Sequence, residues 1–322
     1  MMHPIPPGTR DVLPDEMSEL RAITERLRAT LAGAGYGEVW TPMVEYEDVL
    51  HTGDESSAGA AYRMFDEQGR VLALRSDMTI PIARLVATRL SDAREPLRLA
   101  YFAHAYRSVG QGSGHQSEFL QAGLELIGVE GEAGEAEVIE LTLAALDAAG
   151  LARHRIGLGD GALYRTLLAA LDVPPGRQDD LIERLSMRDL VGLELRVHEL
   201  GLAPEARNVL TRLPSLRGGP EVLDGAGGPA DEALDGLRTL YAALADRGVA
   251  DRVILDLGLV RMLGYYTGAV YEVYDPAVGF TLGGGGRYDE LIGRFGRSRP
   301  ACGMALDVQR VHIAQAAEEG LT

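Results

Sequence analysis

The sequence predicts an α+β fold in which an antiparallel sheet is flanked by helices and interrupted by a helical insertion. Two observations predict the sheet. Extended apolar segments come in pairs joined by polar or glycine-containing turns, and most of them lack the helical crossovers that a parallel sheet requires. A third predicts the insertion, because between residues 162 and 247 the leucines follow helical spacing and the strand patterns stop.

The first helix is expected to begin near Pro14, because proline followed by two acidic residues is typical of a helix start. Gly33 is expected to end it. Its apolar face consists of residues at helical spacing, namely Leu20, Ile23, Leu27 and Leu31. Further helices are expected over residues 79–90 and 133–149 and after residue 306.

The strands are expected in short apolar segments on both sides of the insertion. The expected strand over residues 39–44 contains Pro42, which belongs at an edge or at a bend that faces an interface. The other expected strands are residues 71–74, 97–106, 119–127, 253–257, 270–274, 280–282 and 301–306. The pair 97–106 and 119–127 and the pair 270–274 and 280–282 are predicted to be hairpins. We therefore expect a core of residues 1–160 and 251–322 with a mainly helical insertion over residues 161–250.

Composition and charge argue against several classes of function. The 322 residues carry 48 acidic and 31 basic side chains, a net charge of −17, whereas proteins that bind nucleic acid usually present a basic face. The single cysteine, Cys302, excludes an intrachain disulfide and a cysteine-based metal cluster, and its surroundings indicate a buried strand. The seven histidines show no metal-ligand spacing, so neither a metal nor a cofactor is expected. A signal sequence and membrane-length apolar runs are also missing, which predicts a cytoplasmic protein.

Polar residues at the start of the expected helix 79–90 allow two interpretations. Asp77 and Thr79 follow a strand and stand two residues apart. They could bind an ammonium group, or they could accept backbone N–H groups as a helix cap. Taken alone, the pattern favours the cap.

The second strand of the first hairpin carries polar residues where core residues are expected. Gln121 and Glu125 are four residues apart and therefore lie on one face of the strand. That face is either a solvated surface or the floor of a pocket. The residues alone favour the solvated surface.

Two segments near the C-terminus are similarly ambiguous. Arg261 lies in an apolar region and needs an anion, which is either a ligand or an internal acid such as Asp256. Tyr265 and Tyr266 follow it and would place hydroxyl groups on opposite faces of a strand. The glycines at 283–286 permit close approach of a ligand or form a plain tight hairpin, and they match neither a P-loop nor a Rossmann motif.

Taken together and in this order, the segments resemble class II histidyl-tRNA synthetases and their non-charging relatives. The resemblance covers residues 4–315, except for the insertion, where only position and character are similar. Residues 7–14 resemble the start of the family's sequences, and Pro42 resembles the motif 1 proline at the dimer interface. Residues 101–128 resemble motif 2, and residues 300–311 resemble motif 3. The two histidine-specific signatures are similar to residues 261–266 and 284–289.

The resemblance implies a histidine-binding pocket. In it, Asp77, Thr79 and Gln121 would hold the α-ammonium group and Arg261 would lie near the α-carboxylate. Glu125 and Tyr266 would bracket the imidazole, with Tyr265 and Arg107 also at the site. Arg107 and Arg310 would remain from a nucleotide site, and Pro42 would lie at a homodimer interface. Asp77 replaces the glutamate of the charging enzymes and is shorter by one methylene group.

Several departures from the charging enzymes indicate that this chain does not charge tRNA. Gly110, His115 and Ser117 stand roughly where the motif 2 loop of the enzymes carries basic residues, so phosphate binding should be weak. Asp307 and Gln309 replace a glycine and a glutamate beside Arg310, and Gly264 replaces an aspartate. The chain ends about a dozen residues after Arg310, which leaves no room for a C-terminal anticodon-binding domain.

Within this group, the best match is the family of ATP phosphoribosyltransferase regulatory subunits, whose members share Asp77, Thr79 and the pattern of residues 121–125. The resemblance implies a non-catalytic subunit at the first step of histidine biosynthesis. It would bind histidine, activate a short-form catalytic subunit and confer allosteric feedback inhibition on it. Two alternatives remain open: a truncated synthetase-like ligase that forms an aminoacyl-adenylate, and a free-standing histidine-binding dimer.

Overall fold

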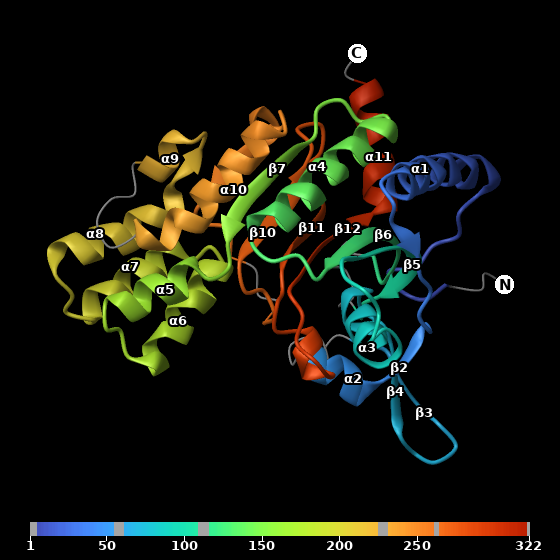
Figure 1. Ribbon diagram of the computed structural model, residues 1–322, viewed down its shortest axis with the longest axis horizontal. Coiled ribbons are helices and arrows are strands. Elements are labelled where there is room, and N and C mark those ends of the chain that lie inside the picture. Colours follow the sequence, from blue (N-terminus) through green and yellow to red (C-terminus); the bar gives the residue numbers. More distant parts are fainter. Residues whose placement is uncertain (1–4, 55–60, 109–115, 225–230, 261–263, 321–322) are drawn as a thin grey trace.

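The structure, a computed structural model, describes residues 5–54, 61–108, 116–224, 231–260 and 264–320. Within these ranges the main sheet has nine strands in the order β1-β5-β6-β12-β11-β10-β7-β9-β8 (Figure 1). The pairs β1–β5 and β7–β9 are parallel and all other neighbours are antiparallel. The predicted α+β class is therefore confirmed, with a mixed sheet in place of a purely antiparallel one.

The strands of the main sheet agree well with those expected. In chain order they are β1 (Gly37–Glu38), β5 (Leu97–Tyr106), β6 (Glu118–Ile127), β7 (Arg155–Asp160), β8 (Arg217–Gly218), β9 (Val253–Asp256), β10 (Ala269–Tyr274), β11 (Thr281–Arg287) and β12 (Ala301–Asp307). Both predicted hairpins form, as β5–β6 and β10–β11. Strands β1, β7 and β8 were not predicted. Strand β7 is buried along most of its length, and its glycines hide the usual strand pattern.

Helices cover one face of this sheet. Helices α1 (Pro14–Gly33) and α4 (Glu132–Ala148) pack on each other and on β6, and α11 (Val308–Glu319) follows β12 and packs beside α1 (Figure 1). The predicted apolar face of α1 is buried in the same core as the side chains of Ala122, Leu124 and Leu126 from β6. The alternate residues of β6 therefore face away from α1 and α4.

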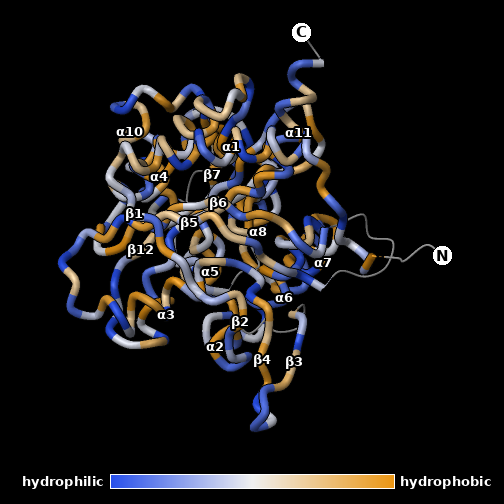
Figure 2. The backbone as a smooth tube through the Cα atoms, turned by 90° about the vertical axis from the view of Figure 1, so that its right-hand side faces the viewer, coloured by the Kyte–Doolittle hydropathy of each residue, from blue (hydrophilic) through white to orange (hydrophobic). Residues whose placement is uncertain are grey.

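A second sheet of three strands lies beside the first. Its order is β2 (Val44–Tyr46), β4 (Val71–Leu74) and β3 (Arg63–Phe65). Helices α2 (Glu47–Gly53) and α3 (Thr79–Arg89) adjoin it, and its hairpin projects from the body of the protein (Figure 2). The single strand expected over residues 39–44 is wrong. Residues 39–43 instead cross from the main sheet at β1 to the small sheet at β2.

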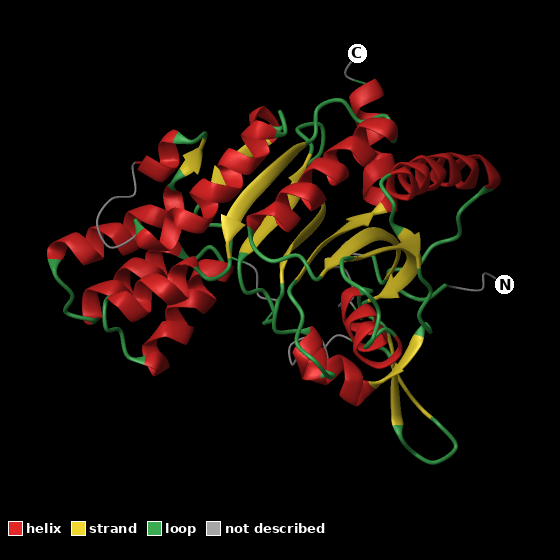
Figure 3. Cartoon of the chain, in the orientation of Figure 1, coloured by secondary structure: helices red, strands yellow, loops and turns green. Residues whose placement is uncertain are grey.

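The segment between β7 and β9 is mainly helical, as expected. It contains α5 (Leu163–Ala170), α6 (Pro175–Ser186), α7 (Leu190–Glu199), α8 (Pro204–Arg212), α9 (Glu221–Asp224) and α10 (Asp235–Asp246). Helices α5 to α8 gather at one end of the sheet, where Figure 3 shows mostly red ribbon. The short strand β8 lies within this segment and pairs with β9 at the edge of the sheet. No helix of the described residues is long and apolar enough to cross a membrane.

The glycines at 283–286 lie inside strand β11 and do not form the turn of a tight hairpin. Their neighbours explain why glycine is needed. A Cβ on Gly285 would lie 2.0 Å from the carbonyl oxygen of Gly303 in β12, and one on Gly286 would lie 2.7 Å from the ring of Tyr266. The missing side chains let a neighbouring strand and an aromatic ring come close to β11.

Candidate functional site

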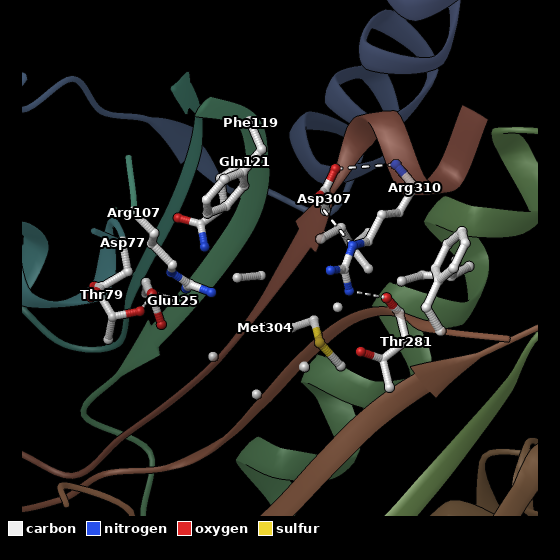
Figure 4. A pocket seen from close by; sticks show the side chains of 18 of the residues that line it. Asp77, Thr79, Arg107, Phe119, Gln121, Glu125, Thr281, Met304, Asp307 and Arg310 are labelled. Carbon is white, nitrogen blue, oxygen red and sulfur yellow. Dashed lines mark hydrogen bonds and ion pairs between the residues drawn. The ribbon is translucent and has the colours of Figure 1, made fainter. Parts of the chain in front are cut away.

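A cavity of about 500 Å³ opens on the face of β6 that points away from α1 and α4. Its walls come from β6, β11, β12, the start of α11 and two connecting segments, residues 77–79 and 265–266. A volume of this size suits a small-molecule ligand. Figure 4 shows many of the side chains that line it.

The cavity brings together most of the residues that the sequence singled out. Of the eight predicted histidine-binding residues, the seven that the structure describes line it: Asp77, Thr79, Arg107, Gln121, Glu125, Tyr265 and Tyr266. Arg310 lines it as well. Arg261 lies outside the described residues. The convergence supports a common site, whereas the role of each residue stays a prediction.

Residues 75–79, which we call the binding turn, connect β4 to α3. Asp77 caps the helix, since its Oδ1 accepts a hydrogen bond from the backbone N–H of Ile80 at 3.0 Å, and it also lines the cavity. The two interpretations of Asp77 are therefore compatible. Burial raises the pKa of Asp77, while the hydrogen bond from Ile80 and the charge of Arg107 oppose that rise.

Gln121 and Glu125 form the floor of the cavity, with exposed fractions of 5% and 1%. The favoured alternative of a solvated sheet surface is therefore wrong, because α3 and the C-terminal strands cover this face. The Oε1 of Gln121 accepts a hydrogen bond from the backbone N–H of Met78 at 3.0 Å. A carbonyl oxygen has two lone pairs, so this atom can accept one more hydrogen bond from a ligand.

Glu125 is held by two hydroxyl groups. Thr79 Oγ1 donates to Glu125 Oε1 at 2.9 Å, and the Tyr288 hydroxyl donates to Glu125 Oε2. Burial raises the pKa of Glu125 to about 8; the hydroxyl groups lower it and the nearby charge of Asp77 raises it. Gly303 makes room for this arrangement, because a Cβ there would lie 1.6 Å from Glu125 Oε2.

The aromatic wall of the site is larger than the sequence indicated. The rings of Tyr265 and Tyr266 lie 4.9 Å apart, and Tyr288 meets Tyr265 edge-on at 5.9 Å. The expectation that Tyr265 and Tyr266 point to opposite faces of a strand is wrong. They lie in the loop before β10 and line the same cavity, because the strand begins only at Ala269.

The sequence prediction missed Tyr288, which lines the cavity, and Tyr101, a fully buried neighbour of Glu125 that does not line it. Tyr288 belongs to the segment 284–289 that resembles a histidine signature, so a closer reading of that motif could have found it. Tyr101 pairs with Gly123 across the β5–β6 ladder, and its hydroxyl fills the space where a Gly123 side chain would stand. That relation depends on strand register, which a single sequence does not reveal.

The far end of the cavity contains a neutralised arginine. Arg310 Nη1 donates to the carbonyl oxygen of Thr281 at 2.8 Å, and its Nε lies 3.4 Å from Asp307 Oδ2. Asp307 also caps α11 by accepting from the backbone N–H of Arg310. Figure 4 shows this group across the cavity from Asp77, Thr79 and Glu125. Asp307 lines the cavity and lowers the positive charge there.

The remaining candidate residues lie as follows. Arg107 stacks over the ring of Phe119 at 5.0 Å and donates from Nε to the carbonyl oxygen of Ser76 at 3.3 Å. Gln309 is buried, and its Oε1 accepts from the backbone N–H of Leu120 at 2.8 Å. Pro42 is exposed.

Asp256, the suggested internal partner of Arg261, has arginine partners among the described residues. Its Oδ2 lies 3.4 Å from an Arg188 nitrogen and 3.9 Å from Arg217 Nε. Cys302 is buried in β12 as expected, and burial raises the pKa of its thiol. The described residues contain no group of three or more acidic, histidine or cysteine side chains placed to hold a metal ion.

The fold is a class II synthetase core of the histidyl type, as the similar proteins show. The histidyl-tRNA synthetase family matches residues 8–311. A histidyl-tRNA synthetase structure from Nostoc shares the fold, with a TM-score of 0.81 at 21% identity over 100% of this chain and 77% of that one.

Proteins that are more similar to this chain than the Nostoc enzyme show to which family of histidyl-type cores it belongs. A protein of Symbiobacterium thermophilum named ATP phosphoribosyltransferase regulatory subunit is 45% identical over 98% of this chain and 82% of its own length. One of the same name from Desulforamulus reducens is 41% identical over 96% and 78%. A Bacillus halodurans structure described as an ATP phosphoribosyltransferase regulatory subunit/histidyl-tRNA synthetase has a TM-score of 0.91 at 35% identity, over 98% and 84%. This chain belongs to the family of ATP phosphoribosyltransferase regulatory subunits.

Proposed function

We propose that this chain binds L-histidine in the cavity and regulates a catalytic ATP phosphoribosyltransferase subunit according to the histidine supply. One observation carries the proposal: Asp77, Thr79, Gln121 and Glu125 converge with tyrosine rings in one buried cavity. These side chains come from segments far apart in the sequence, and each offers hydrogen-bonding groups that an amino acid with a polar ring can use.

The cavity matches the parts of histidine in turn. The α-ammonium group would bind the Asp77 carboxylate, the Thr79 hydroxyl and the free lone pair of Gln121 Oε1, which are all acceptors. The imidazole would lie between Glu125 and the tyrosine rings, where ring nitrogens find a carboxylate and the ring faces find aromatic partners. Arg107 and Arg261 are the candidates for the α-carboxylate.

We further propose that the chain itself is not an enzyme. Transfer of an adenylate needs cations that are free to hold the phosphates of ATP. Arg310 is instead engaged by Asp307 and by the carbonyl oxygen of Thr281. In contrast, one observation favours the alternative of a ligase that forms an aminoacyl-adenylate: both Arg107 and Arg310 line the cavity. The net charge of −17 argues against a nucleic-acid partner.

The proposed partners are two. The names of the relatives point to a catalytic subunit, and we propose a short-form enzyme of the first step of histidine biosynthesis, which this chain activates and, with histidine bound, inhibits. The second partner is another copy of this chain. Exposed Trp40, Pro42 and Met43, which we call the Pro42 surface, offer it an apolar contact. Both partners would be cytoplasmic.

Calorimetry with L-histidine tests the site. We expect one histidine per chain, with affinity reduced about tenfold or more in Glu125→Gln, because a hydrogen bond to a charged group is lost. Glu140→Gln is the matched control, since Glu140 lies on α4 and pairs with Arg247. Undiminished affinity in Glu125→Gln would show that the assigned site is wrong.

Two further assays separate the alternatives. Strong histidine-dependent exchange of pyrophosphate into ATP by the isolated chain would support the ligase and overturn the regulatory proposal. Failure to co-purify with a co-expressed short-form catalytic subunit would support a free-standing histidine-binding dimer. We expect no exchange and a stable complex whose activity falls when histidine is added.

A further inference from the structure

Tyr265 and Tyr266 belong to a short segment, residues 265–268, which we call the tyrosine loop. Both tyrosines line the cavity, and strand β10 begins directly after the loop at Ala269. A Cβ on Gly286 would lie 2.7 Å from the Tyr266 ring, so the loop lies tightly against β11. The position of this loop therefore decides where the aromatic wall of the cavity lies.

Backbone hydrogen bonds hold the middle of the tyrosine loop to neighbouring segments. The N–H of Thr267 donates to the carbonyl oxygen of Arg287 at 2.8 Å. The Thr267 hydroxyl accepts from the backbone N–H of Asp289 at 3.0 Å. Gly268 follows, and its carbonyl oxygen accepts from the N–H of Gly161 at 2.9 Å. The end of β11 is therefore one of the anchors of the loop.

The residue after the loop is held by Glu135, which lies in the first turn of α4. Glu135 Oε1 accepts a hydrogen bond from the backbone N–H of Ala269 at 3.2 Å, and the same oxygen lies 3.2 Å from Arg287 Nε. The exposed fractions of Glu135 and Arg287 are 3% and 6%, and neither residue lines the cavity. One buried carboxylate therefore contacts both the residue that follows the loop and the arginine whose carbonyl group holds Thr267.

Arg287 is fixed by further contacts. Its Nη1 donates to Asp289 Oδ1 at 2.9 Å and to the carbonyl oxygen of Val129 at 3.3 Å, and its Nη2 donates to the carbonyl oxygen of Gly131. These bonds join β11 to the segment that leads into α4. A buried ion pair often adds little net stability, because the cost of removing two charges from water offsets their attraction. The pair of Arg287 and Glu135 does, however, fix the place of the segments that it joins.

We infer that Glu135 is a positioning residue for the histidine site, which holds the tyrosine loop and so places the Tyr266 ring against the ligand. The inference rests on the proposed function, since it names what keeps one wall of that site in place. Glu135 acts through the loop, because it contacts Ala269 and Arg287 and does not itself line the cavity. Loss of its charge should let the loop shift, and histidine affinity should then fall about tenfold.

Calorimetry with L-histidine on Glu135→Gln is the first test. Glutamine keeps the size of the side chain but removes the negative charge beside Arg287. Glu137→Gln is the matched control, because Glu137 lies on the same helix and pairs with Arg98 on β5, with hydrogen bonds of 2.8 and 2.9 Å. We expect the affinity to be about tenfold lower in Glu135→Gln and within about twofold of wild type in the control. Wild-type affinity in Glu135→Gln would overturn the inference.

A double-mutant cycle separates positioning of the ring from a general loss of structure. Tyr266→Leu removes the ring that Glu135 is inferred to place. Adding Glu135→Gln to this variant should therefore lower the histidine affinity by less than about twofold. A general structural defect would instead reduce the affinity by the same factor with and without the ring, and that result would overturn the inference.

Hydrogen exchange of the wild-type protein needs no variant, so it decides the case even if Glu135→Gln does not fold. Histidine should slow exchange in the tyrosine loop and also at residues 129–136, which do not line the cavity but are joined to the loop through Glu135 and Arg287. Residues 141–148, at the other end of α4, are the internal control and should not change. Protection of the loop without protection of residues 129–136 would overturn the inference.

The outcomes also distinguish this inference from the proposed function. If the wild-type protein binds histidine while Glu135→Gln has no effect and residues 129–136 gain no protection, the inference is wrong and the proposed function stands. If calorimetry detects no histidine binding by the wild-type protein, the proposed function is wrong and the inference fails with it.

Discussion

The Tyr288 hydroxyl donates a hydrogen bond to the Glu125 carboxylate inside the cavity, where the two residues are 3% and 1% exposed. Glu125 is thus a buried acid that receives hydroxyl hydrogen bonds, and no ion pair joins it to a cation among the described residues. Burial raises its pKa to about 8. The raised pKa favours the protonated form of Glu125 in the empty site, so a ligand that needs the carboxylate must displace a proton.

Histidine affinity should therefore rise with pH between 7 and 8. In this window the imidazole of free histidine is mostly neutral, and the α-ammonium group of a free amino acid titrates at higher pH. Glu125, with a pKa of about 8, therefore changes its charge while the ligand changes little. With a pKa of about 8, the ionised fraction of Glu125 grows about fivefold from pH 7 to pH 8. Calorimetry in two buffers of different ionisation enthalpy should show release of close to one proton per histidine at pH 7. Affinity that is flat across this window would contradict the assignment.

The same pKa predicts a cost in stability. The unfolded chain ionises Glu125 near pH 4.5 and the folded protein only near pH 8, so the ligand-free protein loses stability as pH rises between these values. Glu125→Gln removes this loss and should be more stable than wild type by about 3 kcal/mol at pH 7, with the difference vanishing near pH 4. Urea unfolding at several pH values measures it. Glu140→Gln should follow the wild type, and a destabilised Glu125→Gln would contradict the prediction.

Tyr288→Phe should move the pH dependence upward. The Tyr288 hydroxyl lowers the pKa of Glu125, so its removal makes the carboxylate harder to ionise. We expect histidine affinity at pH 7 to fall about tenfold and to recover partly toward pH 9. Tyr241→Phe on α10 is a control outside the cavity and should change neither value. Equal loss at all pH values would mean that Tyr288 acts by packing alone.

Much of this fold could be predicted from the sequence because its periodicities are local. Strand β5 has the predicted bounds, Leu97–Tyr106, and α4 agrees within one residue, since alternation and helical spacing can be read within a single segment. The crossing of residues 39–43 between two sheets could not be read this way. In this crossing the carbonyl oxygens of Thr41 and Pro42 accept hydrogen bonds from Arg75, which lies more than thirty residues further along the chain.

The candidate site shows the same limit. The alternation of β6 placed Gln121 and Glu125 on one face, but it did not reveal that residues of α3 and the C-terminal strands cover that face. The resemblance to a known family supplied the correct choice. Neither approach identified Tyr101, because its position next to Gly123 and Glu125 follows from the strand register.

Gly303→Ala should abolish histidine binding by displacing Glu125. The added Cβ would lie 1.6 Å from Glu125 Oε2. The Glu125 side chain cannot move aside easily, because the hydroxyl groups of Thr79 and Tyr288 hold it on both oxygens. Gly279→Ala is the control, because the space around Gly279 is open. Calorimetry should show loss of binding in the first variant and wild-type affinity in the second. Full binding in Gly303→Ala would mean that the position of Glu125 does not control the site.

Asp307→Asn should raise the affinity of the cavity for ATP. The sequence differences from the synthetases in motifs 2 and 3 predict that this affinity is weak in the present chain. Asparagine still accepts the backbone N–H of Arg310 and so keeps the cap of α11, but it no longer neutralises the Arg310 guanidinium. A phosphate group at the far end of the cavity is then no longer repelled by the Asp307 charge. It also no longer competes with the Asp307 carboxylate for the Arg310 guanidinium. We expect the affinity for ATP to rise about tenfold over wild type, because one charge-assisted hydrogen bond contributes a free energy of about this size. Calorimetry with magnesium ATP measures this, with Asp235→Asn on α10 as the control. An unchanged ATP affinity would mean that Asp307 is not what keeps nucleotide out.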